Sequence, residues 1–239
     1  MKMIRTTALI LCTAAITASA QTIQVSKENR TISVTATDKV TAMADTATVH
    51  IGFIAYGPSS DAAYANGSRI SNAIVKALTS AGVPSASIES ENQSVAPVQP
   101  YQVEKLTEAE KAQRKFQVTQ SWTVRTGADD AAKVLDTAVK AGANQSGQID
   151  WSFRDENAPA SEAAAKALKR AQVQAEQMAR SLNAKLGELL YASNEAQPGP
   201  IRPLLHAMVA GRMDKVQPLA INPRQIETTA TVHAVFAIE

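Results

Sequence analysis

Two stretches near the start of the chain alternate apolar and polar residues, which is the period expected of β-strands with one buried face. The first covers residues 31–36 and the second covers residues 46–56. Their apolar positions are Ile32, Val34 and Ala36, followed by Ala47, Val49, Ile51, Phe53 and Ala55. Both stretches are predicted to be half-buried strands.

The spacing of apolar residues changes to three and four after Gly57-Pro58. This pattern predicts an amphipathic helix over residues 59–82, because Gly82 is a typical helix end and Pro84 cannot continue the helix. A weaker strand is predicted over residues 88–95. The polar stretch 96–114 favours an exposed excursion or a short solvated helix.

A second strand–helix–strand cycle follows the first. Residues 115–124 and 148–153 alternate in the manner of strands, and residues 128–141 have an acidic start and a basic end, as the helix dipole favours. Both predicted helices end in Ala-Gly, at residues 81–82 and 141–142. The two cycles form a weak internal repeat.

The longest predicted helix covers residues 159–184. Its apolar positions alternate between spacings of four and three, and they are Ala164, Leu168, Ala171, Ala175, Met178 and Leu182. Such a narrow stripe of mostly small residues is expected to pack closely against a sheet. A short strand over 189–192 and a final strand over 225–238 complete the pattern. The predicted fold class is α+β: a mixed, largely antiparallel sheet with helices packed on one side.

The stretch 197–223 contains five of the ten prolines and is longer than an ordinary connection. One interpretation is a surface loop. The other is an assembly arm that docks on a neighbouring subunit or on a membrane surface, because basic residues flank its apolar centre. The apolar residues of this arm would be Leu204, Leu205, Met208 and Val209.

The N-terminus has the pattern of a secretory signal peptide. Lys2 and Arg5 precede an uncharged run over residues 6–20 that closes with Ala18-Ser19-Ala20. A membrane anchor is the rival interpretation, but the run is shorter than the roughly 20 apolar residues that span a bilayer. We therefore expect a cleaved signal peptide at 1–20 and an exported mature domain at 21–239.

Composition changes this picture in two ways. The chain has 239 residues, of which 45% are apolar, but 44 are alanine, so its core is expected to be thin or shared between subunits. The 24 basic residues fall to 22 without Lys2 and Arg5, which equals the 22 acidic ones. A neutral domain has no long-range field to attract nucleic acid, so no nucleic-acid partner is predicted.

Few residues are suited to catalysis or metal binding. The single cysteine, Cys12, lies in the predicted signal peptide, and the three histidines lack the spacing of a metal site. His50 and His233 are predicted to be exposed and to need no partner. Asp45, Asp150 and Asp155 are assigned to turns and caps, and Trp122 and Trp151 to the core. No catalytic, cofactor-binding or metal-binding residues are therefore predicted.

Several segments, in this order and spacing, resemble the SIMPL domain family. They are residues 31–36, residues 40–52 with Ala44-Asp45, Tyr101 after a proline-containing loop, Gly142-Ala143-Asn144 before the Ile149-Trp151-Phe153 strand, the alanine-rich helix 163–184, and the terminal Val235-Phe236-Ala237-Ile238-Glu239. The resemblance implies an α+β fold and homo-oligomers. It also implies a bacterial periplasmic or outer-membrane-associated protein, similar to immunogenic proteins and to oxidative-stress defence proteins.

Two hypotheses about function follow. The first is an exported, non-enzymatic protein that self-assembles and has a structural or stress-protective role, because contact between copies would bury the apolar area that a thin core lacks. The alternative is a periplasmic ligand-binding protein or enzyme with a site near the Tyr101 loop. A cavity with convergent polar groups would favour the alternative.

Overall fold

A computed structural model describes residues 30–195 and 219–239. The predicted signal peptide and the four apolar residues of the predicted arm lie outside the described residues. The strands are β1 (Thr31–Met43), β2 (Thr46–Gly57), β3 (Ile88–Pro97), β4 (Phe116–Gly127), β5 (Gln145–Ser152), β6 (Leu186–Glu195) and β7 (Gln225–Ile238). The helices are α1 (Ser60–Ser80), α2 (Pro100–Val103), α3 (Glu108–Gln113), α4 (Ala131–Lys140) and α5 (Asn157–Ser181), with short 3₁₀ turns η1 (Ser85–Ser87) and η2 (Ala128–Asp130).

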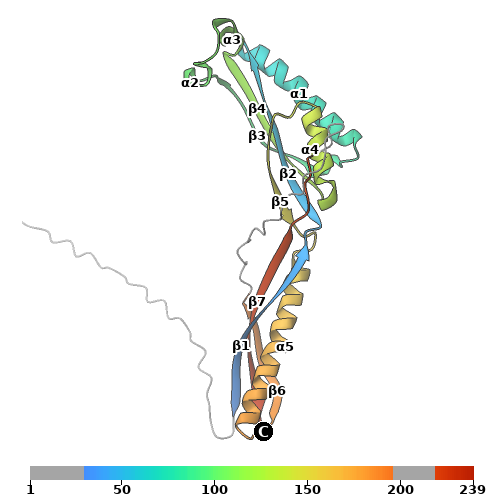
Figure 1. Cartoon of the computed structure of the whole chain (residues 1–239), viewed down its shortest axis with the longest axis vertical. Helices are drawn as coiled ribbons and strands as arrows, with labels where there is room; N and C mark the ends of the chain where they lie inside the picture. The colour runs from blue at the N-terminus through green and yellow to red at the C-terminus, as the bar shows by residue number, and fades with distance from the viewer. Residues whose placement is uncertain (1–29, 196–218) are drawn as a thin grey trace, which may run out of the picture.

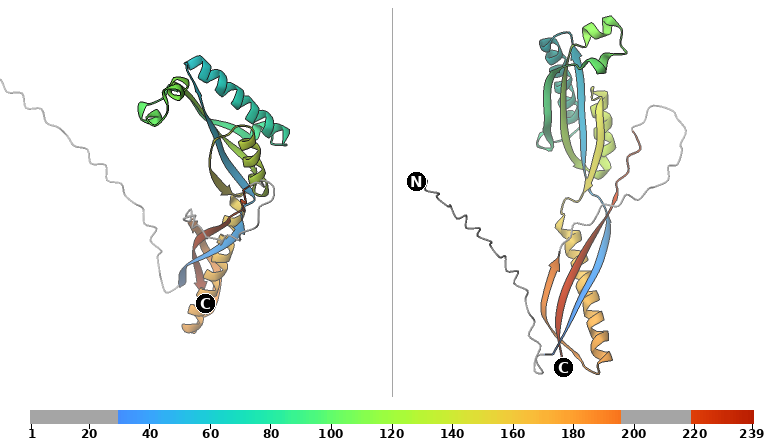
Figure 2. Two further views of the ribbon diagram at one scale, coloured as in Figure 1. Left: turned by 45° about the horizontal axis from the view of Figure 1, so that its top comes forward. Right: turned by 90° about the vertical axis from the view of Figure 1, so that its left-hand side faces the viewer.

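The molecule is elongated and consists of two bodies arranged end to end (Figure 1). The upper body has a four-stranded sheet in the order β3-β4-β2-β5, and the lower body has a three-stranded sheet in the order β1-β7-β6. Figure 2 shows α1 and α4 on one face of the upper sheet and α5 on one face of the lower sheet. The predicted α+β class with helices on one side is confirmed.

The strands divide between two sheets instead of forming one. β1 pairs with β7 along its whole length, from Thr31 opposite Ala237 to Met43 opposite Gln225. β2 begins three residues later and pairs with β4 and β5. Every strand pair in the described residues is antiparallel. The two sheets arise because the ladder is broken at Ala44-Asp45, where the chain passes from one body to the other.

Large side chains fill the core of the upper body. Phe53, Ile51, Ile74 and Leu78 are fully buried, and the ring of Phe53 lies 5.8 Å from that of Trp122. The predicted inward set of β2 and the core position of Trp122 are confirmed. α1 approaches the sheet closely because it has Gly67 at the contact, where an added β-carbon would lie only 2.8 Å from Val118 Cγ1.

Alanine forms the contact between α5 and the lower sheet. The buried residues of α5 recur at a strict spacing of four, and they are Ala163, Ala167, Ala171, Ala175 and Ala179. The last four of them pack in one cluster with Ile32, Val34 and Phe236. Ala163 packs in a smaller cluster with Val40 and Ala230. Because four residues advance a helix by more than one turn, this buried line winds around α5 and follows the twist of the sheet.

The predicted stripe is therefore partly wrong. Ala171 and Ala175 are buried as predicted, but Met178 is 47% exposed and Leu182 is 64% exposed. The alternating spacing of four and three describes a straight stripe, and a helix lying on a twisted sheet does not present one. The helix also ends before residue 184, because Asn183 adopts a positive φ of 52°.

The polar stretch between β3 and β4 forms the tip of the upper body (Figure 1). It contains the short helices α2 and α3, which agrees with the predicted excursion. A reciprocal capping box between Thr107 and Glu110 begins α3. These hydrogen bonds from Thr107 lower the pKa of Glu110 below its usual value. Arg114 lies over the ring of Tyr56 at 5.2 Å, which joins the tip to β2.

Candidate functional site at the waist

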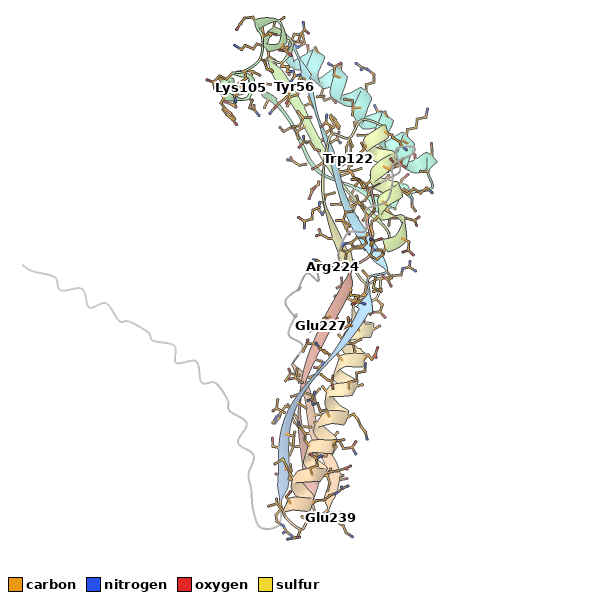
Figure 3. The ribbon with its side chains drawn as sticks, in the orientation of Figure 1. Tyr56, Lys105, Trp122, Arg224, Glu227 and Glu239 are labelled. Atoms are coloured by element: carbon orange, nitrogen blue, oxygen red, sulfur yellow. The ribbon has the colours of Figure 1, made fainter. Side chains whose placement is uncertain are left out.

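The two bodies meet at a waist built around Ala44-Asp45. The backbone N–H of Ala44 donates to the carbonyl of Arg224 at 2.9 Å, and the N–H of Ala128 donates to the carbonyl of Asp45 at 3.0 Å. The N–H of Arg154 donates to Asp45 Oδ1 at 2.7 Å. Figure 3 shows Arg224 at this level, where β7 begins. Ala44-Asp45 is itself one passage of the chain between the bodies. Its hydrogen bonds join it to the two other passages, at Arg154 and at Arg224.

The carboxylate of Asp45 is stabilised in its charged form. The hydrogen bond from the Arg154 N–H is the largest cause of the lowered pKa of Asp45, and the Thr46 hydroxyl contributes next by donating at 2.9 Å. A carboxylate that accepts such bonds favours ionisation. The turn role predicted for Asp45 is confirmed, and the structure adds that this turn connects the two bodies.

A cavity of about 700 Å³ lies beside the waist. Its walls come from the loop after α1, the end of β4, the first turns of α4, and the link between β5 and α5. Six charged residues line it: Arg125, Asp130, Lys133, Arg154, Asp155 and Glu156. None of the six forms a side-chain ion pair within 4.0 Å in the part of the chain that the structure describes.

Sequence reasoning missed this cavity because its walls are far apart in the chain. Residues 81–84 and 125–137 are brought next to residues 152–157 only when α1 and α4 pack on the upper sheet. Each charged residue, considered alone, is typical of a solvent-exposed surface position. The signal present in the sequence was the clustering of charges at 125–133 and 154–156, immediately after two predicted strands.

A second group of charges lies on the face of the upper sheet opposite the helices. His50 Nε2 is 2.9 Å from Asp150 Oδ2, and His50 Nδ1 is 3.7 Å from Glu91 Oε1. Gln148 donates to Asp150 Oδ1 at 2.6 Å. The hydrogen bond from Gln148, followed by that from His50, lowers the pKa of Asp150. The prediction that His50 needs no partner is wrong, and Asp150 belongs to this cross-strand group instead of a turn or cap.

The other predicted polar residues have ordinary structural roles. Asp155 Oδ1 accepts the N–H of Asn157 at 3.0 Å at the start of α5, as predicted. His233 Nδ1 lies 3.1 Å from Thr35 Oγ1, and the His233 ring lies 6.2 Å from the ring of Tyr191. The prediction that His233 needs no partner is therefore also wrong. Trp151 is partly buried against the upper core, as predicted.

The residue predicted to mark a ligand site lies elsewhere. Tyr101 is on α2 at the tip and is 75% exposed. It lines neither the waist cavity nor a second, smaller cavity of about 490 Å³ on α5 around Met178 and Leu182. Of the stretch 197–223, the described part includes Ile221, which packs against the upper core.

The described ranges, 30–195 and 219–239, contain no cluster of three or more histidine, cysteine, aspartate or glutamate side chains arranged to hold a metal ion. They also contain no helix with the length and apolarity needed to cross a membrane.

Comparison with known families decides the classification. The family model described as SIMPL, a protein of unknown function (DUF541), matches residues 32–236. The chain belongs to the SIMPL family. The match runs from β1 into β7, so the SIMPL unit includes both bodies and the waist between them. No curated protein matches the chain.

Proposed function

We propose that this SIMPL protein is an exported, non-enzymatic protein that assembles with copies of itself and acts as a structural or stress-protective factor in the periplasm. The observation that carries the proposal is the open edge of the lower sheet. β1 and β6 are its outer strands, and no described element pairs with their outer edges. An uncovered edge is a template for adding a strand from another chain.

The outer edge strand β6 carries an apolar run. Leu189, Leu190 and Tyr191 are 44%, 47% and 45% exposed. Fully burying a large apolar side chain stabilises a protein by about 1.5–3 kcal/mol. Side chains that are half exposed would gain part of this free energy when a partner covers them. β1 offers a regular ladder of 13 residues with no bulge in its pairing to β7.

The edge strands of the upper sheet, β3 and β5, have features that hinder pairing with a strand of another chain. β3 carries the exposed carboxylates Glu89 and Glu91, and its pairing with β4 is interrupted by a bulge. β5 carries Asp150 and also has a bulge in its pairing with β2. Charged side chains and bulges are the usual devices that prevent unwanted strand pairing. The pairing of β6 with β7 also has register shifts on both sides of Leu189, so β6 differs from β3 and β5 in its exposed apolar run and not in the regularity of its ladder. This apolar run and the regular ladder of β1 support assembly through the lower body.

Other parts of the proposal have separate support. Export is supported by the signal-peptide pattern of residues 1–20. The stress-protective role and association with the outer membrane are supported by the resemblance to known SIMPL proteins, and the basic residues that flank Leu204 and Leu205 agree with docking on a surface. Cell fractionation tests the compartment: recovery of the protein in the cytoplasm would contradict the proposal.

Light scattering at micromolar concentration tests self-assembly. We expect particles larger than one chain, and we expect Leu190→Lys to weaken association by about tenfold or more, because a charge would be buried at the edge. Val139→Lys on α4 is the matched control, since Val139 is also 47% exposed. A monomeric native protein, or equal effects of the two variants, would contradict assembly through β6.

The waist cavity favours a second function, which is the binding of a small molecule. Its volume and its charged walls satisfy the criterion set out for the ligand-binding alternative. The location differs from the one expected, because Tyr101 lines neither of the two cavities described above.

A further inference from the structure

The charges that line the waist cavity are divided between its two walls. The wall formed by the upper body carries Arg125 on β4 with Asp130 and Lys133 at the start of α4, so basic residues exceed acidic ones by one. The wall formed by the link to α5 carries Arg154, Asp155 and Glu156, so acidic residues exceed basic ones by one. The cavity is neutral overall but polarised across its width.

Several of these charges already have neighbours. Arg154 lies near enough to Asp45 to stabilise the Asp45 carboxylate. Asp155 accepts the N–H of Asn157 at 3.0 Å. The Asp130 carboxylate turns back over Gly127, with Oδ2 at 3.5 Å from the place a β-carbon would take there. Among the described residues, the side chains of Arg125 and Lys133 on one wall and Glu156 on the other have no hydrogen-bond or ion-pair partner.

We propose that the waist cavity binds a small zwitterion, either a free amino acid or a short peptide. Its carboxylate would pair with Arg125 and Lys133, and its ammonium would pair with Glu156. Arginine suits this task because its planar guanidinium accommodates a carboxylate with two parallel hydrogen bonds.

Ligands with a single sign of charge fit the cavity less well. A phosphate or another polyanion would meet three carboxylates, and a polyamine would meet three cations. A zwitterion places each charge against the wall that attracts it. The volume of about 700 Å³ falls within the range of roughly 300–1,000 Å³ that is usual for small-molecule sites.

The position of the cavity gives binding a mechanical consequence. One wall belongs to the upper body, and the other is the link that leads directly into α5 of the lower body. A ligand that contacts both walls would hold residues 153–157 against the end of β4. We therefore expect amide hydrogen exchange in this link to slow when the ligand binds.

The test compares three related peptides with the purified protein by NMR titration at pH 7. Trialanine carries both charges, N-acetyl-trialanine lacks the ammonium, and trialanine amide lacks the carboxylate. We expect trialanine to bind and each modified peptide to bind at least about tenfold more weakly. A parallel titration with alanine distinguishes the two kinds of ligand. If alanine binds more tightly than trialanine, the ligand is a free amino acid, and if alanine binds more weakly, the ligand is a peptide.

Two variants assign the charges to residues. Arg125→Gln is expected to weaken trialanine binding and to remove the preference for trialanine over its amide, while the preference over the acetylated peptide stays. Glu156→Gln is expected to do the reverse. Lys185→Gln and Glu188→Gln, at the far end of the lower body, are the matched controls and should change neither preference.

The comparison within the native protein does not depend on how the variants fold. Absence of binding of both trialanine and alanine at millimolar concentration would overturn the proposal, as would equal binding of the three peptides. Binding of succinate at least as tightly as trialanine would also overturn it, because succinate carries only negative charges. The zwitterion site rests on the small-molecule binding proposed for the waist cavity. None of these outcomes depends on whether the protein self-assembles, so this test is independent of the proposed assembly.

Discussion

The upper and lower bodies place helices on one face of an antiparallel sheet with different side chains. In the upper body, Phe53, Ile74 and Leu78 interlock between two helices and four strands. In the lower body, one helix presents alanines to three strands. Because alanine buries little apolar area, the lower body gains less from the hydrophobic effect and relies on close contact between α5 and the sheet.

The difference suggests why assembly would involve one body and not the other. The upper body buries Phe53, Ile51 and Leu78 completely, and its edge strands β3 and β5 carry carboxylates. The lower body leaves large apolar residues on β6 and at the end of α5 exposed, including Leu190 and Leu182. A body with a thin core and apolar residues on its surface gains more by packing against a second copy, which supports the proposed self-association.

Truncation of the upper core should have the largest effect. Phe53→Ala is expected to lower the free energy of unfolding by about 3–5 kcal/mol, because it removes a fully buried ring and leaves a cavity beside Trp122. Denaturant unfolding followed by tryptophan fluorescence measures the change. Tyr64→Ala on α1, at a 63% exposed position, is the control and should change stability by less than about 0.5 kcal/mol. A loss below about 1 kcal/mol for Phe53→Ala would contradict this description of the core.

In the lower body, a larger side chain at a buried alanine is expected to destabilise the fold. Ala175→Leu is expected to cost about 1–3 kcal/mol, because the larger side chain has no room between α5 and the sheet. Val173→Leu is the control on the same helix, since Val173 is 43% exposed. If Ala175→Leu left stability unchanged or raised it in the same unfolding experiment, the contact would not be the tight one described.

The smallest effect is expected at the waist, and it should depend on pH. The folded-state pKa of Asp45 lies below 3.8, so the ionised carboxylate stabilises the folded protein above that pH. This contribution is lost as the pH falls through the folded-state pKa, because the proton then binds to both states. Asp45→Asn should therefore lower stability near neutral pH and make the loss of stability in acid shallower.

Thermal unfolding from pH 7 down to pH 2 measures this dependence. Asp129→Asn, on the neighbouring η2 turn, is the control because Asp129 forms no hydrogen bond to the link in the described residues. Parallel curves for the native protein and Asp45→Asn would show that the carboxylate does not stabilise the junction between the bodies.

Most of the local structure was predictable from residue patterns. The inward face of β2 follows from its period of two, and α1 is capped by Ser59, whose hydroxyl accepts the N–H of Ala62 at 3.2 Å. The low number of large apolar residues on α5 was also evident. These features depend on neighbours within a few residues, so the sequence contains all the information they need.

The candidate site was not predictable in the same way. The contact of His50 with Asp150 joins residues that are 100 apart, and it depends on the register between β2 and β5. The waist cavity requires three separate segments to meet, and no spacing within one segment indicates that. Register and helix placement are decided by burial over the whole body, which a local pattern does not encode.

The amino-acid sequence by itself determined the α+β class, the identity of the strands and helices, the small-residue face of α5 and the resemblance to SIMPL proteins. The tertiary structure alone decided that the strands divide into two sheets at Ala44-Asp45, which alanines of α5 are buried, and where charges of both signs line one cavity. The physical reason is that backbone geometry sets the period of each element locally, whereas pairing partners, sheet twist and cavities result from contacts between residues far apart in the chain.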